Sequence, residues 1–289
     1  MRFRVWCVLS ALTVSVTLPA DDSVAPAGSD SAGQVQLFES LAETAPSRNA
    51  GMFVGVCNFQ HDPGLATLLY ATHDAIELAH LFVFELNLIP ATNCHLLLAG
   101  EPVDDVVTAH LQQLRRAGAK IGSADRSRIL LTMREVQGTA RESEDILVCG
   151  FSSHGFEDRA DPYIMPSDGF RALLAQTAVP LKTIESMMQD SRAGHRLLLV
   201  DACQERISAK NVQAAGLGTP ATDAFVEALK TPTGQAKLAS CSPGEFSFEH
   251  GSLGGVGHGV FTHYVLEGLR GGAKADAKNI VRLGDVADY

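Results

Sequence analysis

Short runs of consecutive apolar residues recur along the chain, each bounded by polar residues, glycine or proline. Runs of this length are shorter than a typical helix, and they indicate strands that are buried on both faces. The runs predict strands over residues 51–57, 94–99, 146–151, 196–201 and 236–241.

Between these runs, apolar residues recur at intervals of three and four positions, as they do on one face of an amphipathic helix. This spacing predicts helices over residues 72–88, 103–117, 126–139, 181–189 and 259–269. Strands that alternate with helices imply βαβ units, and therefore a mainly parallel sheet. We expect an α/β fold, a three-layer sandwich in which helices flank the central sheet on both sides.

The first residues of the chain have a different pattern. Residues 1–4 include two arginines, residues 5–18 are mainly apolar, and Pro19-Ala20 precedes two aspartates. This order is typical of a secretory signal peptide, because the apolar run is shorter than the ~20 residues that a membrane span needs. We therefore expect residues 1–20 to be a signal peptide and the mature protein to be exported, periplasmic or secreted. An uncleaved anchor or a misassigned start is the alternative.

Residues 21–49 are rich in alanine, serine, proline and glycine, which indicates a linker with one short helix around residues 34–43. The folded domain is expected over residues 50–289. Hydrophobic residues make up 46% of the chain and charged residues 19%, so a well-buried core is feasible. The net charge of −10 argues against a nucleic-acid-binding surface and is compatible with cationic substrates.

The chain has 6 cysteines, of which Cys7 falls in the expected signal peptide. No pair has C-x-x-C spacing, so a zinc site is not expected. Most of the remaining cysteines lie in or beside strand-like runs, where cysteine is usually a small buried hydrophobe rather than a disulfide partner.

Two of the predicted strands end in residues that can carry catalysis. The run 146–151 leads into Ser152-Ser153-His154-Gly155, and the run 196–201 leads into Ala202-Cys203. Because reacting groups in an open α/β sheet gather beyond the carboxyl ends of its strands, we expect His154 and Cys203 to share one edge. A cysteine beside an imidazole base is the arrangement of a thiol nucleophile. The alternatives are a buried strand cysteine and a loop histidine.

These residues resemble the motifs of the caspase-like cysteine peptidases (peptidase family C14), and especially the bacterial metacaspase-like branch. Ser153-His154-Gly155 resembles the histidine motif and Asp201-Ala202-Cys203-Gln204 the cysteine motif. Cys203 follows His154 by 49 residues, close to the roughly 50 of caspases. Three supporting motifs follow the family order, in residues 72–75, 240–245 and 257–262, and the resemblance covers about residues 51–289.

The resemblance implies a caspase-like fold and a cysteine-type endopeptidase that uses a Cys-His dyad. It also implies three parts, which are a large-subunit-like part over residues 50–205, a linker over 206–235 and a small-subunit-like part over 236–289. The backbone N–H groups of Gly155 and Cys203 are then the expected oxyanion hole. A catalytically silent caspase-like module that binds peptides or partners is the main alternative, and a different thiol hydrolase on the same fold is another.

Three positions of the family's acidic pocket correspond here to Asp74, Ser152 and Asp201. Asp201 lies two residues before Cys203, so both side chains are expected on the same side of an extended strand. A carboxylate there would bind a basic side chain, with bidentate geometry for arginine. We therefore expect cleavage after Arg or Lys, and protein or peptide substrates with basic residues. For Asp74 the alternative is a carboxylate that stabilises the start of its own helix.

Two departures from the family flank the expected dyad. Ser153 stands where glycine is usual, and Gln204-Glu205 follow the cysteine in place of small residues. No cofactor is expected. Calcium is an alternative, because some metacaspases bind it at acidic loops, but the acidic residues here lack EF-hand spacing and favour a solvated loop. These residues are Glu157, Asp158, Asp161 and Asp168. No stable membrane span is expected in the mature form.

Overall fold

The structure is a computed structural model that describes residues 47–159, 161–202, 204–206, 235–240 and 248–273. The expected signal peptide, the short helix around residues 34–43 and most of the expected linker 206–235 lie outside the described residues. Cys203 also lies outside them, although its neighbours on both sides are described.

Six strands of the described part form one sheet in the order β10-β8-β4-β1-β2-β3. Every neighbouring pair in this sheet is parallel. The strands are β1 (Ala50–Val56), β2 (Cys94–Ala99), β3 (Lys120–Ser123), β4 (Ile146–Ser152), β8 (His195–Asp201) and β10 (Gln235–Ala239). All residues of β1 and β4 are buried, which explains why their sequences are continuous apolar runs.

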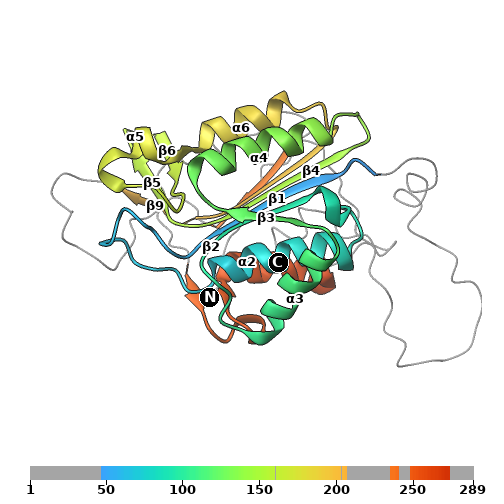
Figure 1. The fold of residues 1–289 in the computed structure, drawn as a ribbon, viewed down its shortest axis with the longest axis horizontal. Helices are drawn as coiled ribbons and strands as arrows, with labels where there is room; N and C mark the ends of the chain where they lie inside the picture. The colour runs from blue at the N-terminus through green and yellow to red at the C-terminus, as the bar shows by residue number, and fades with distance from the viewer. Residues whose placement is uncertain (1–46, 160, 203, 207–234, 241–247, 274–289) are drawn as a thin grey trace, which may run out of the picture.

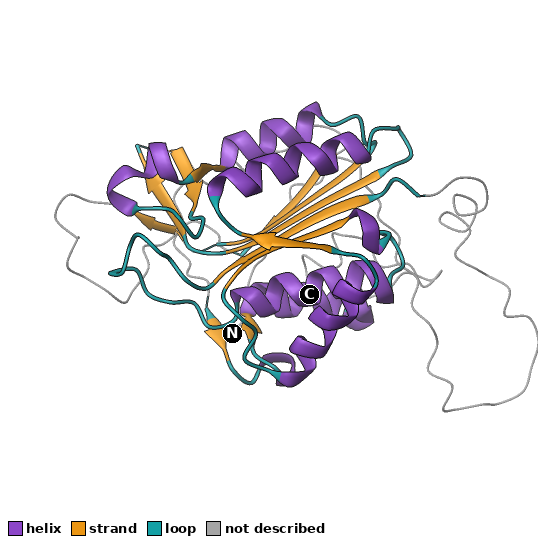
Figure 2. Ribbon diagram, viewed as in Figure 1, coloured by secondary structure: helices purple, strands orange, loops and turns teal. Residues whose placement is uncertain are grey.

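Helices cover both faces of the sheet (Figures 1 and 2). One face carries α4 (Arg126–Thr139) and α6 (Leu181–Asp190), and the other carries α2 (Ala71–His80), α3 (Asp105–Arg116) and α8 (Val260–Glu267). Each face of the sheet has its own hydrophobic core, and successive side chains of β1 point into one core and then the other. Met52 packs in the core with α4 and α6, whereas Phe53 packs in the core with α2, α3 and α8. The predicted α/β three-layer architecture is thus confirmed.

A second, four-stranded sheet has the order β7-β6-β5-β9 and lies at one end of the main sheet (Figure 1). Its strands are β5 (Gly155–Asp158), β6 (Asp161–Ile164), β7 (Val179–Pro180) and β9 (Gln204–Arg206). A two-stranded antiparallel pair consists of β11 (Glu249–His250) and β12 (His258–Gly259). Short helical turns complete the described elements: η1 (Leu81–Glu85), η2 (Ala91–Asn93), η3 (Arg171–Leu173), α5 (Leu174–Thr177), η4 (Leu253–Gly255) and η5 (Gly268–Gly272).

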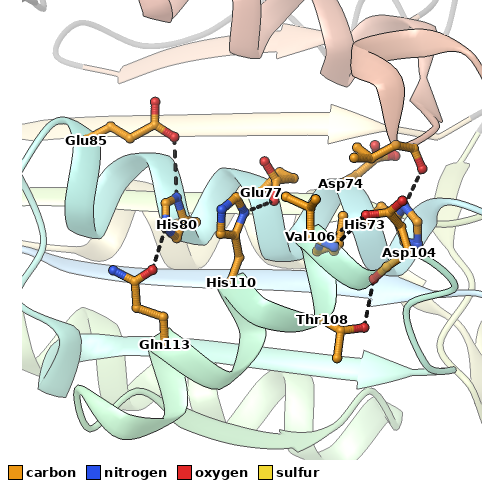
Figure 3. A network of polar contacts seen from close by, with 12 residues as sticks. His73, Asp74, Glu77, His80, Glu85, Asp104, Val106, Thr108, His110 and Gln113 are labelled. Atoms are coloured by element: carbon orange, nitrogen blue, oxygen red, sulfur yellow. Dashed lines mark hydrogen bonds and ion pairs between the residues drawn. The ribbon is translucent and has the colours of Figure 1, made fainter.

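Helix α2 is the central helix of its layer, and all ten of its residues are buried. It carries an unusual number of buried polar side chains, several of which bond to α3 (Figure 3). His80 and His110 stack with ring centroids 3.8 Å apart, and His110 Nδ1 lies 2.5 Å from Glu77 Oε1. Arg270 of η5 reaches the same cluster through Glu77 and Glu85. This polar network ties the helix layer together.

No helix in the described ranges combines the length and the apolar character needed to cross a membrane.

Candidate active site

Strands β4 and β8 are neighbours, and their carboxyl ends bring the two sequence motifs to one edge of the sheet. Ser152 pairs with Asp201 in the ladder, and the Ser153 N–H donates to the carbonyl of Asp201 at 3.1 Å. In the second sheet, Gly155 is paired with Gln204. The residues on either side of Cys203 therefore adjoin the segment that holds His154.

His154 is buried, with 8% of its surface exposed, and its ring lies between Phe59 and Phe156 at centroid distances of 5.1 and 6.2 Å. Its Nε2 lies 2.8 Å from the carbonyl oxygen of Ala66. A carbonyl only accepts, so Nε2 carries the proton and Nδ1 keeps the lone pair. Burial lowers the pKa of His154, which favours the neutral, proton-accepting imidazole.

Ser153, the departure before the histidine, has a defined structural role. Its hydroxyl donates to the carbonyl of Met165 at 2.6 Å, and Met165 N–H donates to the carbonyl of His154 at 2.9 Å. These bonds tie the end of β4 to the residue that follows β6. A serine is therefore accommodated at this position, and it helps to fix the backbone on which His154 sits.

The structure brings Asp74, Ser152 and Asp201 together. Ser152 Oγ donates to Asp74 Oδ2 at 2.9 Å, which joins β4 to α2. Gly259 lies between the two carboxylates, because a Cβ at this glycine would stand 2.4 Å from Asp201 Oδ2 and 3.0 Å from Asp74 Oδ2. Only glycine leaves room for both carboxylate oxygens here. Oδ2 of Asp201 and Oδ2 of Asp74 are therefore both close to the same point beside Gly259.

Three residues of this cluster were not predicted as site residues. His258 Nδ1 lies 2.9 Å from Asp74 Oδ1, and Thr262 donates to Asp201 Oδ2 from its backbone N–H and its hydroxyl. Glu249 accepts hydrogen bonds from the N–H groups of Leu69 and Tyr70, at the start of α2. His258 and Thr262 belong to a quoted motif, but their partners are distant in the sequence, and only the fold reveals the contacts.

The cluster concentrates buried negative charge. Asp74 is 1% exposed and Asp201 7% exposed. Burial raises the pKa of Asp74 well above its usual range, and the charge of Asp201 raises it further. Burial also raises the pKa of Glu249. A site of this kind favours a proton or a cation, because either one relieves the repulsion between the carboxylates.

Two of the four acidic residues that suggested calcium, Asp161 and Asp168, are engaged elsewhere in the fold. Asp161 pairs with Lys182 at 3.0 Å, and Asp168 accepts a hydrogen bond from the Arg126 N–H at the start of α4 at 2.8 Å. In the part of the chain that the structure describes, no group of three or more His, Cys, Asp or Glu residues is arranged to hold a metal ion.

The described cysteines, Cys57, Cys94 and Cys149, are buried free thiols. Burial raises the pKa of both Cys94 and Cys149 to about 12, so these thiols stay protonated at neutral pH. A protonated, buried thiol is a poor nucleophile. Cys149 lies within β4, the strand that leads to His154, and it is buried there as expected for a cysteine in an apolar run.

Comparison with protein-family models matches the caspase domain over residues 50–283, which is most of the chain. Comparison with curated protein sequences finds no match. The matched span begins with β1, extends past the last described turn and includes both strand ends described above. The chain therefore belongs to the caspase-domain family of cysteine peptidases, peptidase family C14.

Proposed function

We propose that this protein is a cysteine endopeptidase in which Cys203 is the nucleophile and His154 the general base, and that it cleaves after Arg or Lys. The observation that carries the proposal is that an oriented, buried histidine and a buried pair of carboxyl groups, Asp74 and Asp201, lie at one sheet edge. Family membership supports the reaction class. The carboxylates support the substrate class.

In this mechanism, Nδ1 of His154 accepts the proton of the Cys203 thiol as the sulfur attacks the scissile carbonyl carbon. The imidazolium then protonates the leaving amine, and water hydrolyses the resulting thioester. The Ala66 carbonyl orients the ring through Nε2 and stabilises the imidazolium that forms. No carboxylate is needed for this orienting role.

The tetrahedral oxyanion requires preorganised donors, and the backbone N–H groups of Gly155 and Cys203 are the proposed pair. Gly155 is paired with Gln204, the residue that follows Cys203, and this register supports the assignment. One such donor contributes roughly 3–4 kcal/mol to transition-state stabilisation in comparable enzymes.

The acidic cluster accounts for the proposed specificity. A guanidinium or ammonium group near Asp201 and Asp74 would relieve their mutual repulsion, whereas an aspartate side chain would add to it. Ser152 contributes by holding Asp74 through its hydroxyl. The net charge of −10 also favours the approach of basic peptides.

A thiol-directed active-site probe and a set of peptide reporters test the proposal. We expect the probe to label the wild-type protein and the Cys149→Ala control but not Cys203→Ala. Reporters with Arg or Lys before the scissile bond should be cleaved and Asp reporters should not, and Asp201→Ala should abolish cleavage of the basic ones. Each reporter is assayed with calcium and with a chelator, since we propose that no cofactor is required. Equal labelling of Cys203→Ala would refute the nucleophile, and peptide binding without labelling would favour a silent module.

A further inference from the structure

His258 contacts the acidic cluster directly but has no part in the proposed mechanism. It lies on β12, its Nδ1 is 2.9 Å from Asp74 Oδ1, and it is 2% exposed. The same carboxylate accepts hydrogen bonds from Ser152 and from the Gly259 N–H. Asp74 is therefore held by donors of its own chain, and His258 is the one among them that can also carry a positive charge.

The imidazole is confined to this position. Gly254, with φ +59°, lies so close that a Cβ there would be 3.1 Å from His258 Cδ2 and 3.3 Å from Nε2. Gly257 also has a positive φ, and a Cβ there would meet the ring of Tyr70. The ring of His263 stacks on that of His258 at a centroid distance of 6.3 Å. The turn at Gly254 therefore limits the movement of the ring on the side that it covers.

Several charged or titratable groups surround the ring of His258. They are His73, Asp74 and Glu77 on α2, Asp201 on β8, Glu249 and His250 on the paired strand β11, His263 and Glu267 on α8, and Arg270 on η5. Burial lowers the pKa of His258, while Glu77 and Asp201 oppose that shift. Burial and Asp201 raise the pKa of Asp74. The pair therefore shares one dissociable proton, which can be assigned to the carboxyl or to the imidazole with the same total charge.

We propose that His258 is a specificity-determining residue whose protonated ring competes with the basic side chain of the substrate for the charge of Asp74. The proposal rests on the proposed function, because it assumes that a cationic side chain enters this pocket. When the pair holds its proton, the cluster already has a counter-charge and attracts a second cation weakly. When the proton leaves, the cluster binds the substrate's cation in its place.

Because the proton of the pair and the cation of the substrate compete, the affinity for the cation should depend on pH. Binding of a cation disfavours the protonated pair, so affinity rises with pH up to the midpoint of the empty pocket and is constant above it. For one competing proton the change is at most about tenfold per pH unit. An amide at position 258 can still donate to Asp74 but cannot take up a proton, so the proton that remains in this variant is that of the Asp74 carboxyl alone.

The test measures binding of argininamide to inactive Cys203→Ala protein by calorimetry, from about pH 8 to about pH 5. We expect the Kd to increase at least tenfold over this range, and the midpoint of this increase to move to lower pH when His258→Asn is added, because the Asp74 carboxyl alone holds the proton less tightly than the pair does. The control is His195→Asn, which removes an exposed histidine at the far end of β8 and should keep the full pH dependence. The same pH dependence with and without His258→Asn would overturn the proposal, as would absence of binding at every pH.

A second measurement covers the case in which His258→Asn does not fold. The imidazole resonance of His258 is titrated in Cys203→Ala protein with and without saturating argininamide. The ligand should lower the midpoint, and an unchanged midpoint contradicts the competition. Both measurements use inactive protein, so they concern the pocket alone. Failure of the thiol probe to label Cys203 would count against the peptidase and not against this inference.

Discussion

Thr262 and Asp201 are joined through a single carboxylate oxygen. Oδ2 of Asp201 accepts a hydrogen bond from the Thr262 backbone N–H at 3.2 Å and another from its hydroxyl at 2.8 Å. Thr262 lies in the first turn of α8, whose N–H groups have no partner within the helix. A residue at the end of a central strand therefore satisfies the start of a helix far along the chain, and the helix fixes the carboxylate.

Thr262→Val tests this relationship, because valine has nearly the same shape and lacks the hydroxyl. Loss of one donor to a buried carboxylate should lower the free energy of unfolding by about 1–2 kcal/mol. It should also raise KM for an Arg reporter more than it changes kcat, since Asp201 is expected to bind the substrate. Denaturant unfolding and steady-state kinetics check both effects. An equal fall in activity toward reporters with and without basic residues would argue against the specificity role of Asp201.

The pH profile of kcat should reflect His154, because saturating substrate removes the pH dependence of binding in the pocket. Burial lowers the pKa of this histidine, so its imidazole stays neutral and able to accept a proton below the pH at which an exposed histidine becomes charged. Activity should therefore rise with pH through a midpoint below about 6.5. His154→Asn should reduce kcat/KM by about 10²–10⁴-fold. In that variant any residual activity should lack this midpoint; if the midpoint persists, it belongs to another group.

The burial of His154 should also make the stability of the fold depend on pH. The pKa of His154 is lower in the folded chain than in the unfolded chain, so the unfolded chain binds the proton more readily as pH falls. The contribution of His154 to the free energy of unfolding should thus decrease as pH drops from about 6.5 through the lower, folded-state value. A comparison of wild type with His154→Asn by urea unfolding at several pH values isolates this term. Equal pH dependence in the two proteins would contradict it.

The cysteines of the core should not react with alkylating reagents in the folded protein. With their pKa raised to about 12, Cys94 and Cys149 have almost no thiolate at neutral pH, and both are fully buried. Mass spectrometry of iodoacetamide-treated Cys203→Ala protein should therefore show no modification at either position until denaturant is added. Rapid labelling of Cys149 under native conditions would show that β4 opens.

A buried ion pair between Lys237 on β10 and Glu185 on α6 gives a further test. Burial lowers the pKa of the lysine and raises that of the glutamate, which shows that both pay a desolvation cost. Removal of one partner alone, as in Lys237→Met, should destabilise the fold by about 3 kcal/mol. The double variant Lys237→Met with Glu185→Leu should recover most of the loss. A double-mutant cycle with additive effects would show that the pair does not interact.

Much of the main sheet could be predicted because its strands are apolar on both faces. The predicted strand 94–99 coincides with β2, and the predicted helix 126–139 coincides with α4. Strand β3 was missed because its sequence, KIGS, has no apolar run and lies at the exposed sheet edge. The short strands β5 and β6 were missed for a similar reason, since their polar residues alternate too briefly to give a pattern.

The candidate site was only partly predictable. Asp74, Ser152 and His154 follow from family motifs and from the rule that strand ends share an edge. The bond between His258 and Asp74 joins residues 184 positions apart, and neither side chain stands out in a local pattern. The Ala66 carbonyl that orients His154 is a backbone group, and its role depends on the path of a loop. Contacts of these kinds are set by tertiary structure.

The complete burial of α2 limits how this protein can be re-engineered. Asp74 lies on the same helix as His80 and Glu77, which bond to α3 and to Arg270 of η5. This polar network connects α2, α3 and η5. A change of side-chain size or charge on α2 is therefore transmitted to the packing of the whole layer. A designer who wishes to alter substrate preference would do better to vary an exposed position of the turn before β12, such as Ser252, which precedes the buried wall of the cluster.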